Sequence, residues 1–189
     1  MKKPTFFLSS TVFDFHDLRS AIKYTLEQKG CLVLASEFND FRKPLDKHSY
    51  DACLESIEQA EYFILLIGSR VGGWYDEPSR TSITQQEYRT AYELHQRKRK
   101  IKILSFVRKD VWQFRSDHKA LLRHLQEMTL DSAVAKKVLK FPSQHAEDAE
   151  FIINFIEEVG RNRETESATR HSNSFPTGNW LHTFRDFAT

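Results

Sequence analysis

The sequence is poor in the residues that define disulfide-rich and membrane-spanning proteins. Its 189 residues include two cysteines, Cys31 and Cys53, whose spacing matches no metal-binding motif. We therefore expect two buried thiols in a reducing compartment. No apolar run approaches the roughly 18–20 residues that cross a bilayer, and the opening M-K-K-P resembles no secretory signal. These absences predict a cytoplasmic protein that does not enter membranes.

The chain also lacks a strong excess of charge of either sign. A net charge of +2 gives no general reason to expect nucleic-acid binding. The run Arg97-Lys98-Arg99-Lys100 is a local exception at a predicted helix end, where cations complement the helix dipole. It is either a solvated helix end or a weak indication of a partner or nucleic-acid patch. His16, His48 and His95 have no ligand spacing, so we predict no metal site.

What the sequence does contain is a regular alternation of apolar segments. With 40% apolar and 29% charged residues, the composition is that of a folded domain with a core. Strands are expected at 5–9, 31–35, 62–67, 101–107 and 138–141, and helices at 17–29, 49–60, 82–96, 117–128 and 146–159. This order predicts an α/β fold, a flavodoxin-like five-stranded parallel sheet with helices on both faces.

The composition changes after Gly160. We assign residues 1–160 to the α/β domain and residues 161–174 to a polar linker. Residues 175–189 recover aromatic side chains, so this segment either docks back on the domain or leads into a domain that the chain lacks.

The segment that follows the third predicted strand carries most of the chemistry. Tyr62–Ile67 is an unbroken apolar run, typical of a central strand, and it stops at Gly68. A loop with Ser69, Arg70 and Trp74 follows, and then a helix that carries Glu87. Ligands of open α/β sheets bind beyond the carboxyl ends of the strands, so these groups lie where a ligand is expected.

Glu87 has two interpretations. The sequence Thr84-Gln85-Gln86-Glu87 fits a capping box, in which the glutamate bonds back to the start of the helix. Ser82 to Gln85 fits the same pattern, and if Ser82 caps the helix, Glu87 is free to face the ligand. A carboxylate there would stabilise the oxocarbenium-like state of ribosyl C–N cleavage or act as a nucleophile.

Other polar and aromatic residues have similar pairs of interpretations. The run Ser9-Ser10-Thr11 would hold a phosphate or ribose at a helix N-terminus, or would only form a turn. Arg70 would pair with a pyrophosphate, or with a surface carboxylate. Trp74 would stack on a base, or pack over the sheet edge. Phe38 would gate the pocket, mediate self-association, or simply fill the core.

Three blocks of sequence resemble a TIR-like family that is still named as a domain of unknown function. They are F-F-L-S-S-T-V-F-D-F-H-D-L-R near the start, then Y-F-I-L-L-I-G-S-R-V-G with S-I-T-Q-Q-E-Y, and P-T-G-N-W-L-H-T-F-R-D-F near the end. Such domains are similar to TIR domains and nucleoside deoxyribosyltransferases, whose members cleave N-glycosidic bonds with a glutamate on the helix after the third strand. They often stand at the N-terminus of NTPase signalling or immune proteins.

The resemblance implies a catalytic role for Glu87, with NAD as the substrate and neither cofactor nor metal. Around Glu87 we expect a substrate-binding site built from Ser9, Ser10, Thr11, Phe38, Gly68, Ser69, Arg70, Trp74 and Tyr88. The expected function is an NAD glycohydrolase in immune or antiviral defence, activated by homo-oligomerisation or by a protein partner. One alternative is a non-enzymatic module for nucleotide binding or self-association, and another is a nucleoside or nucleotide N-glycosidase.

Overall fold

The computed structural model describes residues 2–42, 44, 46, 48–98, 101–128, 131–140, 142–160 and 181–186. The chain divides into two compact units. Unit 1 consists of Met1–Leu66 and Gly72–Phe106, and unit 2 of Ile67–Val71 and Val107–Thr189.

A five-stranded sheet confirms the predicted α/β fold. Its strand order is β2-β1-β3-β6-β7. Strand β1 (Thr5–Ser9) pairs in parallel with β2 (Leu32–Leu34) and with β3 (Tyr62–Ile67). The other two strands are β6 (Lys102–Arg108) and β7 (Leu181–Phe184). This arrangement is consistent with the predicted flavodoxin-like topology.

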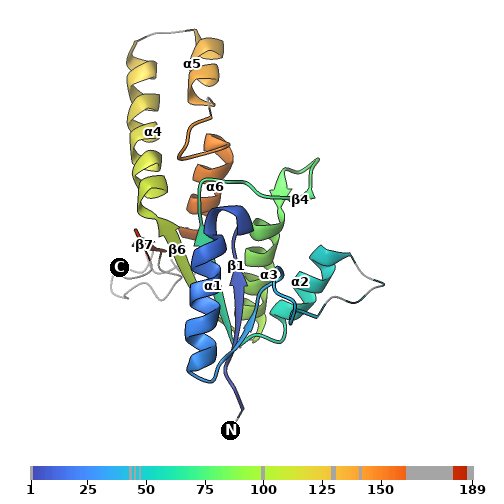
Figure 1. The fold of residues 1–189 in the computed structure, drawn as a ribbon. Helices are drawn as coiled ribbons and strands as arrows, with labels where there is room; N and C mark the ends of the chain where they lie inside the picture. Colours follow the sequence, from blue (N-terminus) through green and yellow to red (C-terminus); the bar gives the residue numbers. More distant parts are fainter. Residues whose placement is uncertain are drawn as a thin grey trace, which may run out of the picture. The chain divides into compact units, whose positions relative to one another are not determined.

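Three helices pack around the strands of unit 1. They are α1 (Val12–Gln28), α2 (Ser49–Ile57) and α3 (Ile83–Lys98), and Figure 1 shows β1 between α1 and α3. The rings of Phe7 and Phe63 stack across β1 and β3, with their centroids 5.8 Å apart. Because β1 and β3 run parallel, with Ser9 opposite Leu65, their carboxyl ends lie side by side at one edge of the sheet.

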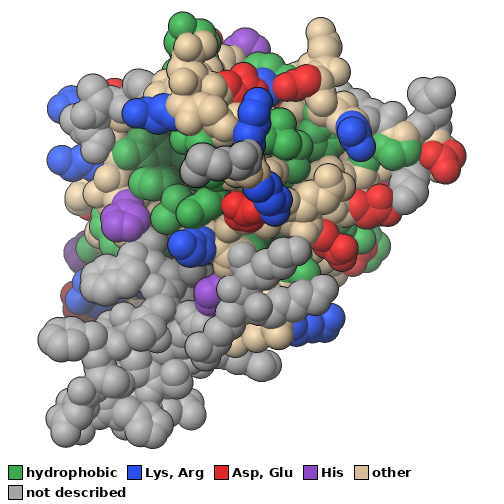
Figure 2. Space-filling view, turned by 90° about the horizontal axis from the view of Figure 1, so that it is seen from below, with side chains coloured by type: hydrophobic (Ala, Val, Ile, Leu, Met, Phe, Trp, Pro, Cys, Tyr) green, Lys and Arg blue, Asp and Glu red, His purple; other side chains and the backbone are tan. Residues whose placement is uncertain are grey.

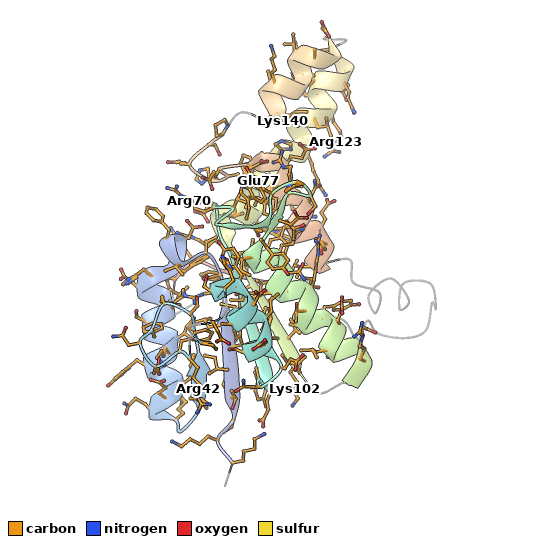
Figure 3. The ribbon with its side chains drawn as sticks, turned by 90° about the vertical axis from the view of Figure 1, so that its right-hand side faces the viewer. Arg42, Arg70, Glu77, Lys102, Arg123 and Lys140 are labelled. Atoms are coloured by element: carbon orange, nitrogen blue, oxygen red, sulfur yellow. The ribbon has the colours of Figure 1, made fainter. Side chains whose placement is uncertain are left out.

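The glycine-containing loop of unit 1 has a structure that the sequence analysis did not predict. Strands β4 (Trp74–Asp76) and β5 (Thr81–Ser82) pair as an antiparallel hairpin directly before α3. Glu77 lies in the connection of this hairpin, and Lys102 lies at the opposite end of the unit, where β6 begins (Figure 3). The hairpin therefore stands at the carboxyl-end edge of the sheet.

Unit 2 is mainly helical. Helices α4 (Lys109–Glu127) and α5 (Ser132–Leu139) lie side by side (Figure 1), and Nε2 of His118 donates to the carbonyl of Leu139 at 2.9 Å. The apolar face predicted for the last helix is confirmed in α6 (Ala149–Gly160). It buries Ile152, Ile153, Phe155, Ile156 and Val159.

The predicted strand at residues 138–141 is wrong. Helix α5 extends through Leu139, and Asp131 caps its start by accepting a 2.9 Å hydrogen bond from the amide of Ala133. Alanine and lysine in this segment favour a helix. The fifth strand of the sheet is instead β7, from the aromatic C-terminal segment.

Two helices begin earlier than predicted. Helix α4 begins at Lys109 rather than Asp117, and Asp110 lies in its first turn. Helix α1 begins at Val12 rather than Asp17, and its backbone kinks at Phe15 (φ −132°, ψ 18°). This kink interrupts the periodicity from which the start was predicted. Gly30 ends the same helix as predicted, with φ +80°.

The predicted linker, residues 161–174, lies outside the described residues. Of the segment 175–189, the structure describes residues 181–186, which include β7. No helix in the described part of the chain combines the length and the apolar character needed to cross a membrane.

Candidate functional site

The centre of the candidate site is the buried carboxyl group of Glu87, on the second turn of α3. Glu87 is 6% exposed. Its Oε2 accepts a 2.6 Å hydrogen bond from the hydroxyl of Ser9, the last residue of β1. The thiol of Cys53, on α2, donates a further hydrogen bond to it. Residues from a strand and two helices therefore meet at the carboxyl end of β1.

A second charged group lies beside this centre. Arg19 on α1 is 1% exposed. Its Nε and Nη2 donate to the two carboxylate oxygens of Glu37, and the Nη2–Oε2 distance is 2.6 Å. Its Nη1 donates to the hydroxyl of Ser10 at 2.8 Å. Because Ser9 and Ser10 are adjacent, the end of β1 connects the Arg19–Glu37 ion pair to Glu87.

The surroundings change the protonation of two groups. Burial raises the pKa of Glu87 to about 7, although the Ser9 hydroxyl, the charge of Arg19 and the Cys53 thiol all act to lower it. Burial, together with the charge of Glu87, raises the pKa of Cys53 to about 12. Near pH 7, Glu87 can therefore hold or release a proton, as a general acid–base group must, whereas the thiol stays protonated.

The hydrogen bonds at the start of α3 show which residue caps this helix. The hydroxyl of Ser82 accepts a 3.2 Å hydrogen bond from the amide of Gln85, so Ser82 caps α3. Glu87 lies five residues beyond this cap, and its carboxyl group bonds to Ser9 and Cys53 instead. The capping role therefore belongs to Ser82, and Glu87 is available for another role.

Two glycines bring the loop close to the end of β1 and to α2. Gly72 has φ +79°, and a Cβ atom there would lie 2.9 Å from Cγ2 of Thr11. A Cβ atom at Gly73 would lie 2.2 Å from the hydroxyl oxygen of Tyr50. The carbonyl of Gly73 accepts a 2.9 Å hydrogen bond from the amide of Ile83, at the start of α3. The glycines thus permit a close approach that side chains would prevent.

Three of the predicted binding residues, Gly68, Ser69 and Arg70, belong to unit 2. There Ser69 and Arg70 contact Glu147, whose amide donates to the carbonyl of Ser69 at 2.7 Å. Nη1 of Arg70, labelled in Figure 3, lies 4.0 Å from Oε1 of Glu147. Oε2 of Glu147 accepts a 3.0 Å hydrogen bond from the amide of Val71. Arg70 thus has a carboxylate partner within its own unit.

The remaining predicted binding residues are in unit 1 and contact protein groups. The guanidinium of Arg80 lies 5.9 Å from the ring centre of Trp74. Nζ of Lys23 lies over the ring of Phe38, 5.3 Å from the ring centre. The Tyr88 ring is buried and stacks on Tyr92, with centroids 6.0 Å apart. The hydroxyl of Thr11 donates to Asp14 at 3.0 Å.

Of the predicted residues, the structure brings Ser9, Ser10 and Glu87 into one cluster. Sequence reasoning missed Arg19 and Glu37, which complete it. Arg19 lay on a predicted helix and Glu37 next to a predicted loop, and nothing in the sequence pairs them. The only signal was an arginine at a position where the helix faces the sheet, since a buried arginine requires a partner.

The described residues include no cluster of metal-ligating side chains, and the basic run at the end of α3 is described only in part. Among them, no three His, Cys, Asp or Glu side chains group closely enough to hold a metal ion. Arg97 lies 3.2 Å from Glu93, one turn away on α3, and residues 99–100 lie outside the described part. On the described surface in Figure 2, Lys and Arg side chains are interspersed with Asp and Glu.

Comparison with known proteins places most of the chain in one family model. Residues 5–174 match the model described as Domain of unknown function (DUF4062). No curated protein matches the sequence.

Proposed function

The chain belongs to the DUF4062 family, and we propose that it is a TIR-like enzyme that cleaves the N-glycosidic bond of NAD. The observation that carries this proposal is the carboxyl group of Glu87, with a pKa of about 7, beside the carboxyl end of β1. Ligands of open α/β sheets bind at that edge. The resemblance of the sequence blocks to TIR-like enzymes supports Glu87 as the reacting carboxylate on separate grounds.

The reaction needs few groups. Water replaces nicotinamide on the ribose carbon, and ADP-ribose, nicotinamide and a proton are the products. Nicotinamide leaves as a neutral molecule, so a strong general acid is not required. Ionised Glu87 either stabilises the oxocarbenium-like transition state, or attacks the ribose carbon as nicotinamide leaves to form an ester that water then hydrolyses. In both cases the hydroxyl of Ser9, which holds Oε2, fixes the carboxylate in place.

The proposal also covers the cellular setting of the enzyme and the way in which it is activated. As in TIR-type enzymes, we place this activity in the cytoplasm and in immune or antiviral defence, with oligomerisation or a protein partner as the activator. Glu87 is buried, and Ser9 and Cys53, which bond to it, lie in the same unit. Activation would therefore have to open the site so that the ribose can reach the carboxylate.

One observation favours the alternative of a non-enzymatic module. A buried carboxyl group with a hydrogen-bonding serine and cysteine also suits a purely structural role. In that case the protein would bind a nucleotide, or a second copy of itself, without cleavage. A nucleoside or nucleotide N-glycosidase would use the same carboxylate on a different leaving group.

The test is release of nicotinamide from NAD by the purified protein at high concentration with a crowding agent. The protein, Glu87→Gln and Glu93→Gln are compared, because Glu93 lies on the same helix but is exposed. We expect release by the protein and by Glu93→Gln, and none by Glu87→Gln. Parallel assays with NADP, nucleotides and deoxynucleosides separate the two enzymatic alternatives. Full activity of Glu87→Gln would refute the proposed role.

A further inference from the structure

The ion pair between Arg19 and Glu37 is not used by the proposed reaction. The two residues are unequally buried, because the side chain of Arg19 is 2% exposed and that of Glu37 is 16% exposed. Two nitrogens of the guanidinium face the two oxygens of the carboxylate, in a bidentate arrangement. A buried guanidinium with one carboxylate partner is a strong and specific anion site.

The two members of the pair are held differently. Arg19 lies within α1, and its Nη1 is fixed to Ser10 at the end of β1. Glu37 lies between β2 and α2, where the described residues form no helix or strand. One turn further along α1, Lys23 binds Asp40 of the same connection at 2.7 Å. Arg19 thus lies in a regular helix, whereas Glu37 lies in a segment without a helix or strand.

The location of the pair matches that of a ligand phosphate. Ser10 follows β1 directly, and the guanidinium lies at the edge of the sheet where Ser9 holds Glu87. The guanidinium of an arginine donates two parallel hydrogen bonds to a phosphate, as it does to a carboxylate. Replacement of the carboxylate by an anionic ligand would leave the buried positive charge neutralised, so the exchange avoids an unpaired charge.

We propose that Arg19 and Ser10 form the anion-binding half of the ligand site, and that Glu37 occupies it as an internal competitor of a phosphate-bearing ligand. The inference rests on the proposed function for the identity of that ligand, a dinucleotide whose pyrophosphate would replace Glu37. It assigns to Arg19 the role that the sequence analysis gave to Arg70. It also makes movement of Glu37 away from the guanidinium a condition of binding.

The test uses inorganic pyrophosphate and the full chain at constant ionic strength. Affinity is obtained from the rise of the melting temperature with pyrophosphate concentration. We expect Glu37→Gln to bind at least about tenfold more tightly than the unchanged protein, because Arg19 loses its internal anion. Asp40→Asn is the matched control, since it removes an ion pair of the same connection without touching Arg19, and it should bind no more than about twofold more tightly.

A double variant tests whether the gain depends on the guanidinium. Arg19→Gln with Glu37→Gln removes both charges and should bind pyrophosphate no better than the unchanged protein. Equal affinity of Glu37→Gln and Asp40→Asn would overturn the inference, as would a gain that survives in the double variant.

A measurement on the unchanged protein covers the case in which Glu37→Gln does not fold. Saturating pyrophosphate should increase hydrogen exchange of the amides at residues 36–42, because their anchor to Arg19 is displaced, and unchanged exchange would overturn the inference. Both measurements are independent of NAD cleavage. Pyrophosphate binding as expected without nicotinamide release would refute the proposed function and leave the anion site standing.

Discussion

The hydroxyl of Ser9 donates a 2.6 Å hydrogen bond to the carboxyl group of Glu87, which lies 78 residues away in the sequence. The bond joins the end of β1 to the second turn of α3. It stabilises the ionised form of a carboxyl group that burial would otherwise keep neutral. Burial outweighs this bond, the charge of Arg19 and the Cys53 thiol, and the pKa of Glu87 is about 7.

The stability of the protein should depend on pH through Glu87. Its pKa is about 7 in the folded protein and 4.5 for the ordinary carboxyl group, so the folded state binds more protons between these values. Protonated Glu87 therefore stabilises the folded state fully below pH 4.5, and this contribution is lost as the pH rises through 7. We expect the free energy of unfolding in urea to fall by about 3 kcal/mol between about pH 5 and about pH 8 from this group.

Two variants identify the origin of this pH dependence. Glu87→Gln should remove the fall, because its amide does not ionise. Glu93→Gln changes an exposed glutamate of the same helix and should keep it. If the Glu87→Gln curve has the same slope as that of the unchanged protein, Glu87 does not have the raised pKa.

Replacement of Ser9 by alanine should move the titration of Glu87 upward. The variant loses a hydrogen bond that favours the carboxylate, so the pKa of Glu87 should rise above its value of about 7. At alkaline pH the protein should lose about 1–3 kcal/mol of stability. The titration can be followed by carbon-13 NMR of labelled glutamate side chains.

Ser105→Ala is the matched control for this substitution. Ser105 is also buried in unit 1, on β6, but its hydroxyl has no hydrogen-bond partner among the described residues. Its removal should leave the Glu87 titration unchanged and should be neutral or stabilising by up to about 1 kcal/mol. Equal effects of the two alanine substitutions would contradict the role given to Ser9.

Gly73→Ala should displace Tyr50. The new Cβ atom would lie 2.2 Å from the tyrosine hydroxyl oxygen but 3.4 Å from the ring carbon that carries it. We expect a loss of about 1–3 kcal/mol, as for other overpacked sites. Tyr50→Phe removes the clashing atom, so the double variant should recover most of this loss. A double-mutant cycle from urea unfolding measures the coupling, and additive effects would show that the two residues are not in contact.

Cys53 should resist alkylation in the folded protein. Its pKa is raised from 9.0 to about 12, which lowers the fraction of reactive thiolate roughly a thousandfold at mildly alkaline pH. Cys31 is less buried and should react first. Mass spectrometry after brief iodoacetamide treatment can quantify both sites, with the urea-unfolded protein as the reference. Comparable labelling of both cysteines in the folded state would refute the expectation.

The fold could be predicted where local sequence decides structure. Tyr62–Ile67 is apolar throughout because β3 is buried, and Gly30 ends α1 because glycine adopts a positive φ without strain. Prediction failed at α5, because residues 138–141 were expected to form a strand although the alanine and lysine residues of this segment favour a helix. It also failed for the β4–β5 hairpin, whose short strands have no periodicity long enough to recognise.

The candidate site could be predicted only in part. Ser9, Ser10 and Glu87 follow strands or begin a helix, so chain order alone indicated that they lie at one edge of the sheet. Arg19 and Glu37 gave no such signal, because their pairing depends on how α1 packs against the segment after β2. By sequence, Arg70 was an equally good candidate for binding a pyrophosphate. The structure gives it a carboxylate partner, Glu147, in unit 2.

The sequence by itself determined the alternation of strands and helices that makes the parallel sheet, and the placement of Glu87 on the helix after β3. These follow from periodicity and from the conformations that each residue type prefers. Only the tertiary structure decided that Glu87 is buried, that Ser9 and Cys53 bond to it and that Glu37 neutralises Arg19. The physical reason is that burial and ion pairing are properties of groups brought together by folding, and the pKa of Glu87 depends on those groups.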